Sequence, residues 1–178
     1  MKTLIQYFLP LLLLIPLSLG AEGLRESRSY QVVKVVDGDT FDATDGTIRF
    51  RVRIAGIDAP EKRTPFSELA TENLKKRIAG KNVELKPVGR KMDQHNRILA
   101  QVLLGGHDIG IEMLETGLAS YYRFPGCPEP PKSPGYDLLP YIAAEQKARE
   151  KKAYLWSGGK VSLPCEGRRK KVVSGVKS

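Results

Sequence analysis

The chain is poor in the residue types that build transition-metal sites. Its 178 residues include 2 cysteines and 2 histidines, and the histidines are His95 and His107. A structural zinc site needs four nitrogen or sulfur ligands at characteristic spacings, and neither Cys127 nor Cys165 has a partner at such a spacing. The sequence therefore argues against a zinc centre.

Long apolar runs are also absent, apart from one at the N-terminus. Residues 4–19 are almost wholly apolar, Lys2 precedes them, and small residues follow at 18–21. This pattern predicts a signal peptide over residues 1–21 and a secreted or periplasmic and cell-envelope location. The run is shorter than a usual membrane span, which takes about 20 apolar residues. An uncleaved N-terminal anchor is the alternative.

Acidic residues are outnumbered by basic ones. The chain has 29 Lys and Arg against 20 Asp and Glu, for a formal net charge of +9. Such a field attracts polyanions, although a basic protein without a nucleic-acid role is the alternative. The last residues, 166–178, combine basic side chains with little to bury and are predicted to be a disordered tail.

Five short runs with β-type composition alternate with turn signals, which is typical of a compact β-rich unit. Asp45-Gly46 separates the second run from the third and predicts a tight hairpin turn, so the first three strands should form a meander. The five predicted strands cover residues 30–36, 40–43, 47–54, 82–88 and 97–104.

Three helices are predicted outside the strands. The first has apolar residues at every fourth position from Phe66 to Ile78 and ends at Gly80. The others are predicted at 109–115 and 140–155, separated by a Pro-rich and Gly-rich loop over 125–140. The pattern favours a β-rich α+β domain over residues 28–160, a five-stranded OB-fold barrel with about three α-helices. Sandwiches and other small α+β folds produce similar patterns.

Carboxylates stand where predicted strands end. Asp37 and Asp39 flank Gly38, and Asp58 and Glu61 flank Ala59-Pro60. Taken singly, each could be a turn former, because Asp and Gly are common in turns. Two arginines, Arg53 and Arg97, could enter the same space if the chain bends near Gly56. Carboxylates that bind a hard cation, together with arginines that grip phosphate, are suited to attack on a phosphodiester.

Four motifs occur in an order that resembles the staphylococcal nuclease family over about residues 30–157. They are Val36-Asp-Gly-Asp-Thr40, Arg53-Ile-Ala-Gly-Ile-Asp-Ala-Pro-Glu61, the segment Asp93 to Arg97, and Lys151-Lys-Ala-Tyr-Leu-Trp-Ser157. The resemblance implies an OB-fold enzyme that uses one Ca²⁺ ion to hydrolyse DNA and RNA and leaves 3′-phosphate ends.

The resemblance also implies roles for individual residues. Asp39, Asp58 and the backbone carbonyl of Ala59 would bind calcium, Glu61 would orient or deprotonate water, and Asp37 would act less directly. Arg53 and Arg97 would bind the reacting phosphate. The chain departs from the family at Ala59, where the prototype has threonine, and at His95, where the family has a tyrosine at the cleft edge.

The tyrosines that contact the nucleoside in the family are harder to place. The alignment slips near Tyr121-Tyr122, and Tyr122 is preferred as the contact with the base; packing of both rings on the barrel rim is the alternative. Tyr122 and His95 are thus the predicted substrate-binding residues. The runner-up function is a non-catalytic OB-fold protein that binds nucleic acid, which would keep basic and aromatic residues while losing acidic ligands. No obligate protein partner is implied, and a monomer is expected.

The two cysteines generate a test of the export prediction. In an oxidising compartment Cys127 and Cys165 are expected to form a disulfide, which could add about 3 to 4 kcal/mol to stability. Titration of the denatured, unreduced protein should then find no free thiol, and the reduced protein should give two. Two thiols before reduction would exclude the bridge.

Overall fold

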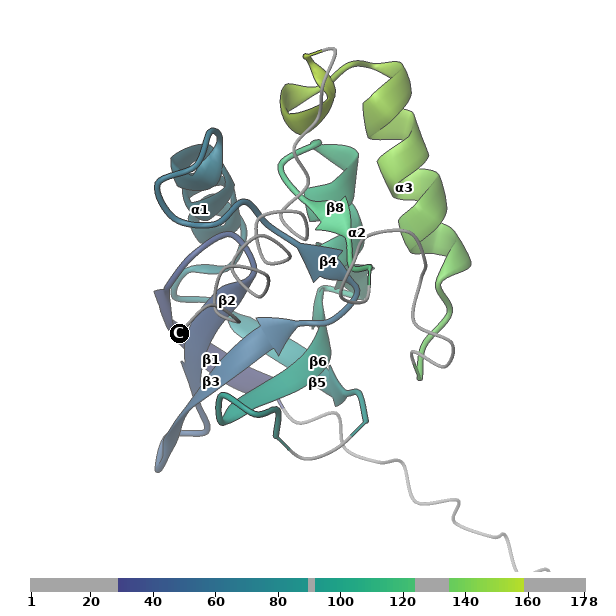
Figure 1. Cartoon of the computed structure of the whole chain (residues 1–178). Coiled ribbons are helices and arrows are strands. Elements are labelled where there is room, and N and C mark those ends of the chain that lie inside the picture. The colour runs from purple at the N-terminus through teal and green to yellow at the C-terminus, as the bar shows by residue number, and fades with distance from the viewer. Residues whose placement is uncertain (1–28, 90–91, 124–134, 159–178) are drawn as a thin grey trace, which may run out of the picture.

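The structure, a computed structural model, describes residues 29–89, 92–123 and 135–158. These residues form a closed five-stranded barrel with three α-helices, as predicted (Figure 1). The predicted signal peptide, the basic tail and both cysteines lie outside the described residues. The elements are β1 (Ser29–Val35), β2 (Thr40–Thr44), β3 (Arg49–Ile54), β4 (Ile57–Asp58), α1 (Ser67–Ile78), β5 (Asn82–Pro87), β6 (Arg97–Leu104), β7 (His107–Asp108), α2 (Ile109–Glu115), β8 (Ser120–Tyr121), α3 (Leu139–Glu150) and the 3-10 turn η1 (Tyr154–Trp156).

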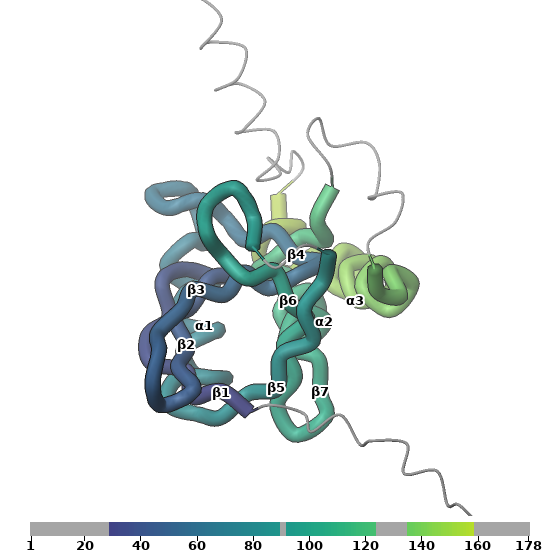
Figure 2. The backbone as a smooth tube through the Cα atoms, turned by 90° about the horizontal axis from the view of Figure 1, so that it is seen from below, coloured from purple at the N-terminus to yellow at the C-terminus, as the bar shows by residue number. Residues whose placement is uncertain are grey.

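The barrel closes through one parallel pair of strands. Strands β1, β2 and β3 form the predicted antiparallel meander, and β5 pairs antiparallel with β1 and β6. The parallel pairing of β3 with β6 completes the ring, which Figure 2 shows from below. Barrel closure removes the free strand edges that an open sheet would leave.

The third strand begins later than its composition predicts. The strand was expected to begin at Thr47 but begins at Arg49, because the Asp45 side chain accepts hydrogen bonds from the two backbone amides just before it. Oδ1 of Asp45 accepts hydrogen bonds from the amides of Thr47 and Ile48, each at 2.9 Å, and Gly46 has φ +96°. These two amides therefore belong to the turn, as Asx-type geometry requires.

The helices share one core with the barrel. Ala70, Leu74 and Ile78 of α1 are fully buried, as their spacing of four residues predicts, and Gly80 follows the helix with φ +72°. Helix α2 has the predicted bounds and contributes Met113 to the same core cluster. In Figure 1, α2 lies between the barrel and α3. Among the described residues, no helix combines the length and the apolar character needed to cross a membrane.

The third helix is shorter than predicted. It ends at Glu150 rather than continuing to Leu155, and Tyr154 to Trp156 form a separate 3-10 turn. The reason is local: Lys152 adopts a left-handed conformation with φ 50°, which a continuous α-helix excludes. Leu155 is still buried, but against Ala148 and Trp156 in a second small cluster.

A buried carboxylate joins α3 to the short strand β8. Glu145 is 2% exposed and accepts hydrogen bonds from Arg123 Nη2 at 2.5 Å, from Arg149 Nε at 2.8 Å and from the amide of Tyr121 at 2.7 Å. Strand β8 in turn pairs with β4, so Asp58 lies opposite Ser120. Helix α3 is thereby tied to the strand that carries Asp58.

Removal of this carboxylate should be costly. Glu145→Ala leaves the buried Arg123 guanidinium without its partner, so we expect a loss of about 3 to 5 kcal/mol in the free energy of unfolding, measured by chemical denaturation. Glu150→Ala, on the same helix but exposed, is the matched control and should stay within about 0.5 kcal/mol of wild type. Equal midpoints for the two variants would contradict the role given to Glu145.

Candidate functional site

Two buried carboxylates share one buried arginine at the barrel rim. Arg53 Nη2 lies 3.2 Å from Asp39 Oδ2 and 3.3 Å from Asp58 Oδ1. The exposed fractions are 8% for Asp39, 2% for Asp58 and 9% for Arg53. Three predicted site residues from separate parts of the chain therefore meet at one point.

Strand pairing and a bend bring these residues together. Thr40 lies opposite Arg53 in the β2–β3 ladder, and the amide of Ile54 donates to the Asp39 carbonyl at 2.8 Å. After β3 the chain turns at Gly56, whose φ of +81° favours glycine. Arg53 Nη1 spans this bend and donates to the carbonyls of Ile54 and Ile57, both at 2.8 Å. In a regular strand Arg53 and Asp58 would point to opposite faces, because they are an odd number of residues apart. The bend brings both side chains to the same place.

The Asp39 carboxylate is oriented by two further donors. Its Oδ2 accepts from the amide of Ala59 at 2.9 Å, and its Oδ1 accepts from the Thr40 hydroxyl at 2.9 Å. Asp37 supports the same turn, since its Oδ1 accepts from the amide of Asp39 at 3.2 Å. Burial, and then the negative charge of Asp39, raise the pKa of Asp37 above its ordinary value. Asp37 therefore acts on Asp39 within the turn that leads into β2.

Gly38 allows the two acidic segments to touch. A Cβ at this position would lie 2.7 Å from the Cβ of Ala59 and 2.7 Å from the Cβ of Ala70 in α1. Real Cβ atoms do not approach so closely, so only glycine fits between the Asp58-Ala59 segment and the helix. Gly38 is needed here for space.

The oxygen atoms of this cluster suit a hard cation. Two buried carboxylates face one guanidinium, so the cluster keeps an excess of negative charge that burial makes unfavourable. Carboxylate and carbonyl oxygens are the ligands that calcium prefers. The described residues contain no group of three or more Asp, Glu, His or Cys side chains that could hold a metal ion. The residues therefore fit calcium only as two carboxylates supplemented by a backbone carbonyl and water.

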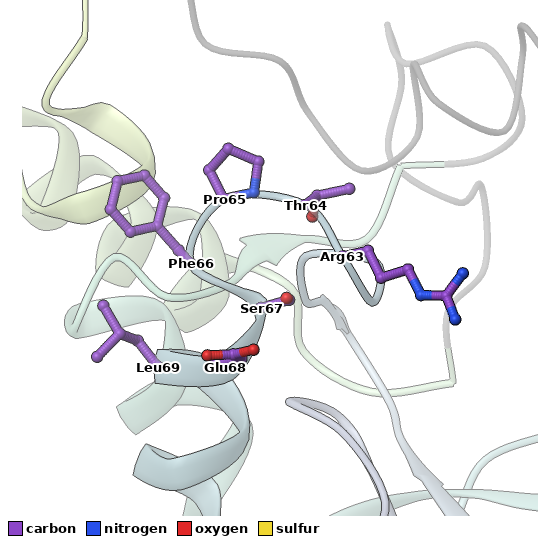
Figure 3. A pocket seen from close by; sticks show the side chains of 7 residues that line it. All are labelled: Arg63, Thr64, Pro65, Phe66, Ser67, Glu68 and Leu69. Carbon is purple, nitrogen blue, oxygen red and sulfur yellow. The ribbon is translucent and has the colours of Figure 1, made fainter.

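Glu61 lies in the exposed turn that follows this cluster. Its carbonyl accepts hydrogen bonds from the amide of Thr64 at 3.0 Å and from the Thr64 hydroxyl at 2.5 Å. Beyond the turn is a surface pocket, and Figure 3 shows Arg63 and Phe66 on its lining pointing in different directions. Its seven lining residues are consecutive, from Arg63 to Leu69, and include none of the predicted ligands. The pocket is thus formed by the turn and the first residues of α1.

Arg97 lies at the start of β6 and is paired with its own loop. Its Nε and Nη2 lie 2.9 Å and 2.8 Å from Asp93 Oδ2. These interactions, with the backbone hydrogen bonds to Asp93, hold the pKa of that carboxyl below its usual value, although burial opposes them. His95 is exposed on the same loop. Arg97 is therefore held by a carboxylate of its own loop, at the start of the strand that pairs with β3.

One tyrosine, Tyr121, is covered by an arginine, and two others, Tyr122 and Tyr136, lie near the site. The Arg123 guanidinium stacks on the Tyr121 ring at 3.6 Å, whereas the amide of Tyr122 donates to the Gly56 carbonyl at 2.7 Å. Tyr136 packs near Gly56, and burial raises its pKa to about 12 although the charge of Arg53 opposes the shift. Tyr136 was not predicted from the sequence, because the whole Pro-rich segment over 125–140 was assigned to a loop. The available signal was an aromatic residue just before the third predicted helix.

The fold and site define a class: a small OB-fold protein whose barrel rim carries paired carboxylates with an arginine. The sequence profile described as "Staphylococcal nuclease homologue" matches residues 51–158. The chain therefore belongs to the staphylococcal nuclease homologue family.

Individual relatives agree with this family. An "Uncharacterized endonuclease" of Haemophilus influenzae is 34% identical over 151 residues, which cover 84% of this chain and 78% of the relative. "Probable endonuclease LCL3" of Komagataella phaffii is 35% identical over 130 residues, 66% of this chain and 54% of that protein. "Staphylococcal-like nuclease CAN1" of Arabidopsis thaliana is 31% identical over 124 residues, 69% of this chain and 34% of that protein. The chain thus spans only part of the yeast and plant relatives.

The close packing at Gly38 can be tested by adding one methyl group. Gly38→Ala should force the Asp58-Ala59 segment away from α1 and lower the free energy of unfolding by about 1 to 3 kcal/mol, as overpacking does. Gly158→Ala is the control, because a Cβ there would meet nothing within 4 Å. Chemical denaturation of both variants measures the difference, and a Gly38→Ala protein as stable as the control would refute the steric argument.

Proposed function

We propose that this protein is a nuclease that hydrolyses phosphodiester bonds of DNA and RNA with the help of calcium and leaves 3′-phosphate ends. The observation that carries the proposal is the meeting of Asp39, Asp58 and Arg53 at one buried point. Membership of the nuclease family supports it, as do the names of the Haemophilus and Komagataella relatives, "Uncharacterized endonuclease" and "Probable endonuclease LCL3".

The residues divide the work between holding the cation and holding the phosphate. Asp39, Asp58 and the carbonyl of Ala59 would hold calcium, which when bound supplies positive charge beside the attacked phosphate. Arg53 would donate through Nη2 to a phosphate oxygen in exchange for part of its contact with Asp39 and Asp58, while Nη1 stays bound to two backbone carbonyls. Its fixed orientation means that little reorganisation is needed as charge develops in the transition state. Arg97 is the second proposed phosphate ligand and would have to exchange its contact with Asp93 for one with substrate.

Glu61 is the proposed general base. A 3′-phosphate product requires that the water oxygen bonds to phosphorus while the bond from phosphorus to the 5′-oxygen breaks. Glu61 would accept the proton of the attacking water, and the departing 5′-oxygen takes up a proton. An exposed carboxylate on the turn after Pro60 can reach solvent water and lies close in sequence to the buried ligands.

The substrate would lie across the rim with its bases toward aromatic side chains. Tyr122 and Tyr136 both lie near each other and near Gly56, the residue at which the chain bends after β3. We propose that Tyr122 and Tyr136 contact the nucleoside next to the scissile phosphate, with His95 at the edge of the cleft. Tyr121 is less suited, because Arg123 already covers one face of its ring.

A second candidate is a non-catalytic OB-fold protein that binds nucleic acid. It would need the basic and aromatic residues but not the buried acidic pair, whose desolvation is unfavourable without a cation to hold. The retained carboxylates therefore favour the enzyme. We further propose that the protein is exported, to the periplasm, the cell envelope or the medium, and acts as a monomer on DNA and RNA.

One assay separates the two candidates. The purified protein should degrade single-stranded DNA and RNA when calcium is added and stop when a chelator removes it. Glu61→Ala should lower the rate by about 100-fold or more, since a positioned general base contributes that much. Glu150→Ala, an exposed carboxylate on α3, is the matched control and should retain the wild-type rate. Degradation that persists in excess chelator would exclude the calcium assignment, and no degradation under any condition would favour the binding protein.

A further inference from the structure

Three arginines occupy alternate positions on β3. Arg49, Arg51 and Arg53 are separated by Phe50 and Val52, and Val52 is fully buried in the barrel while Phe50 packs against the same core. Side chains alternate between the two faces of a strand, so the three arginines all point out of the barrel. Arg53 forms part of the site already described. Arg51 and Arg49 continue from it along the outer face.

Asp42 on the neighbouring strand holds the two outer arginines in place. Arg51 Nε lies 2.7 Å from Asp42 Oδ1, and Arg49 Nη2 lies 3.5 Å from Asp42 Oδ2. The hydrogen bond from Arg51 is the main reason that the pKa of Asp42 is lowered. The Asp42 side chain is 12% exposed, whereas those of Arg49 and Arg51 are 53% and 49% exposed. The carboxylate therefore pairs with both guanidinium groups and leaves about half of each arginine side chain open to solvent.

This surface keeps a surplus of positive charge. Asp42 pairs with both arginines and Asp37 adds a second negative charge near Arg51, whereas Lys34 on β1 lies directly opposite Asp42 in the ladder and adds a third cation. On the other side, Arg97 of β6 is the register partner of Arg51 and is itself paired with Asp93. A row of charged side chains thus crosses four strands beside Arg53. Its net sign suits a polyanion.

The spacing along β3 suits the repeat of a nucleic-acid backbone. Same-face residues on a strand are about 6.6 Å apart, twice the rise per residue, which is close to the separation of successive phosphates in an extended single strand. Guanidinium groups bind phosphate oxygens through paired, charge-assisted hydrogen bonds. A strand with its scissile phosphate at Arg53 would place its next phosphates near Arg51 and then Arg49.

We propose that Arg51 and Arg49 bind the phosphates adjacent to the scissile one, so that the outer face of β2 and β3 is the track of a single-stranded nucleic acid. This inference rests on the proposed function for the role of Arg53. The substrate is then an extended strand that lies on the β2 and β3 side of the barrel.

The test compares two variants that each lose two positive charges. The test variant is Arg49→Ala with Arg51→Ala, and the control is Lys75→Ala with Lys147→Ala, which removes two exposed lysines that also pair with carboxylates. Binding to a fluorescent oligothymidylate is measured across a range of salt concentrations in the presence of chelator, so that calcium-dependent turnover does not interfere. Two lost phosphate contacts should reduce the slope of log K against log salt by about 1.4, at about 0.7 per contact for a single strand. The control should keep the wild-type slope.

Cleavage supplies a second, independent measurement. With calcium, the preference of the wild type in kcat/KM for a long strand over a substrate with one phosphodiester should shrink in the test variant and persist in the control. Equal salt slopes for the test variant and the wild type, or an equal fall in the control, would overturn the track. If the wild type binds but never cleaves, and the slope still falls in the test variant alone, the track stands and the proposed hydrolysis fails.

Discussion

Burial of Arg53 between Asp39 and Asp58 is the interaction on which the rest of the structure depends. Three charges in so little solvent are unfavourable unless each has partners, and the partners here come from two turns and one strand of the barrel. The guanidinium satisfies two carbonyls and two carboxylates at once. One unit of negative charge remains in excess, which makes the cluster a favourable place for a hard cation and for the phosphate that such a cation attracts.

The frame around this cluster is built to hold it in position. Gly38 lets the Asp37–Asp39 turn press against the Asp58-Ala59 segment and α1, while Gly56 lets the chain bend back after β3. The short strands β4 and β8 then carry the constraint outward to the buried Glu145 of α3. The position of Asp58 therefore depends on a helix far along the chain, which links the stability of the C-terminal part to the geometry of the site.

Local chemistry was enough to predict much of this architecture. Alternating apolar residues indicated the five strands, and apolar residues at every fourth position from Phe66 to Ile78 indicated α1. Gly46 and Gly80 indicated turns, and both residues do have a positive φ. The end of α3 was predicted wrongly, because the residue types around Lys152 do not indicate a left-handed conformation, after which Leu155 and Trp156 are buried in a separate cluster. Tyr136 was missed for a related reason: its neighbours along the chain are typical of a loop, and its place beside Gly56 is visible only in three dimensions.

The sequence by itself determined which residue types were available for chemistry, the approximate strands and helices, and the family to which the chain belongs. The strands and helices follow from short-range steric and hydrophobic preferences, which act between neighbours in the chain, and the family follows from the order and spacing of the motifs. Only the tertiary structure decided that Arg53 bridges two carboxylates and that Arg49 and Arg51 share Asp42. Each of these is a contact of a few ångströms, set by the bend at Gly56 and the register of β2 and β3, and no local pattern specifies such distances.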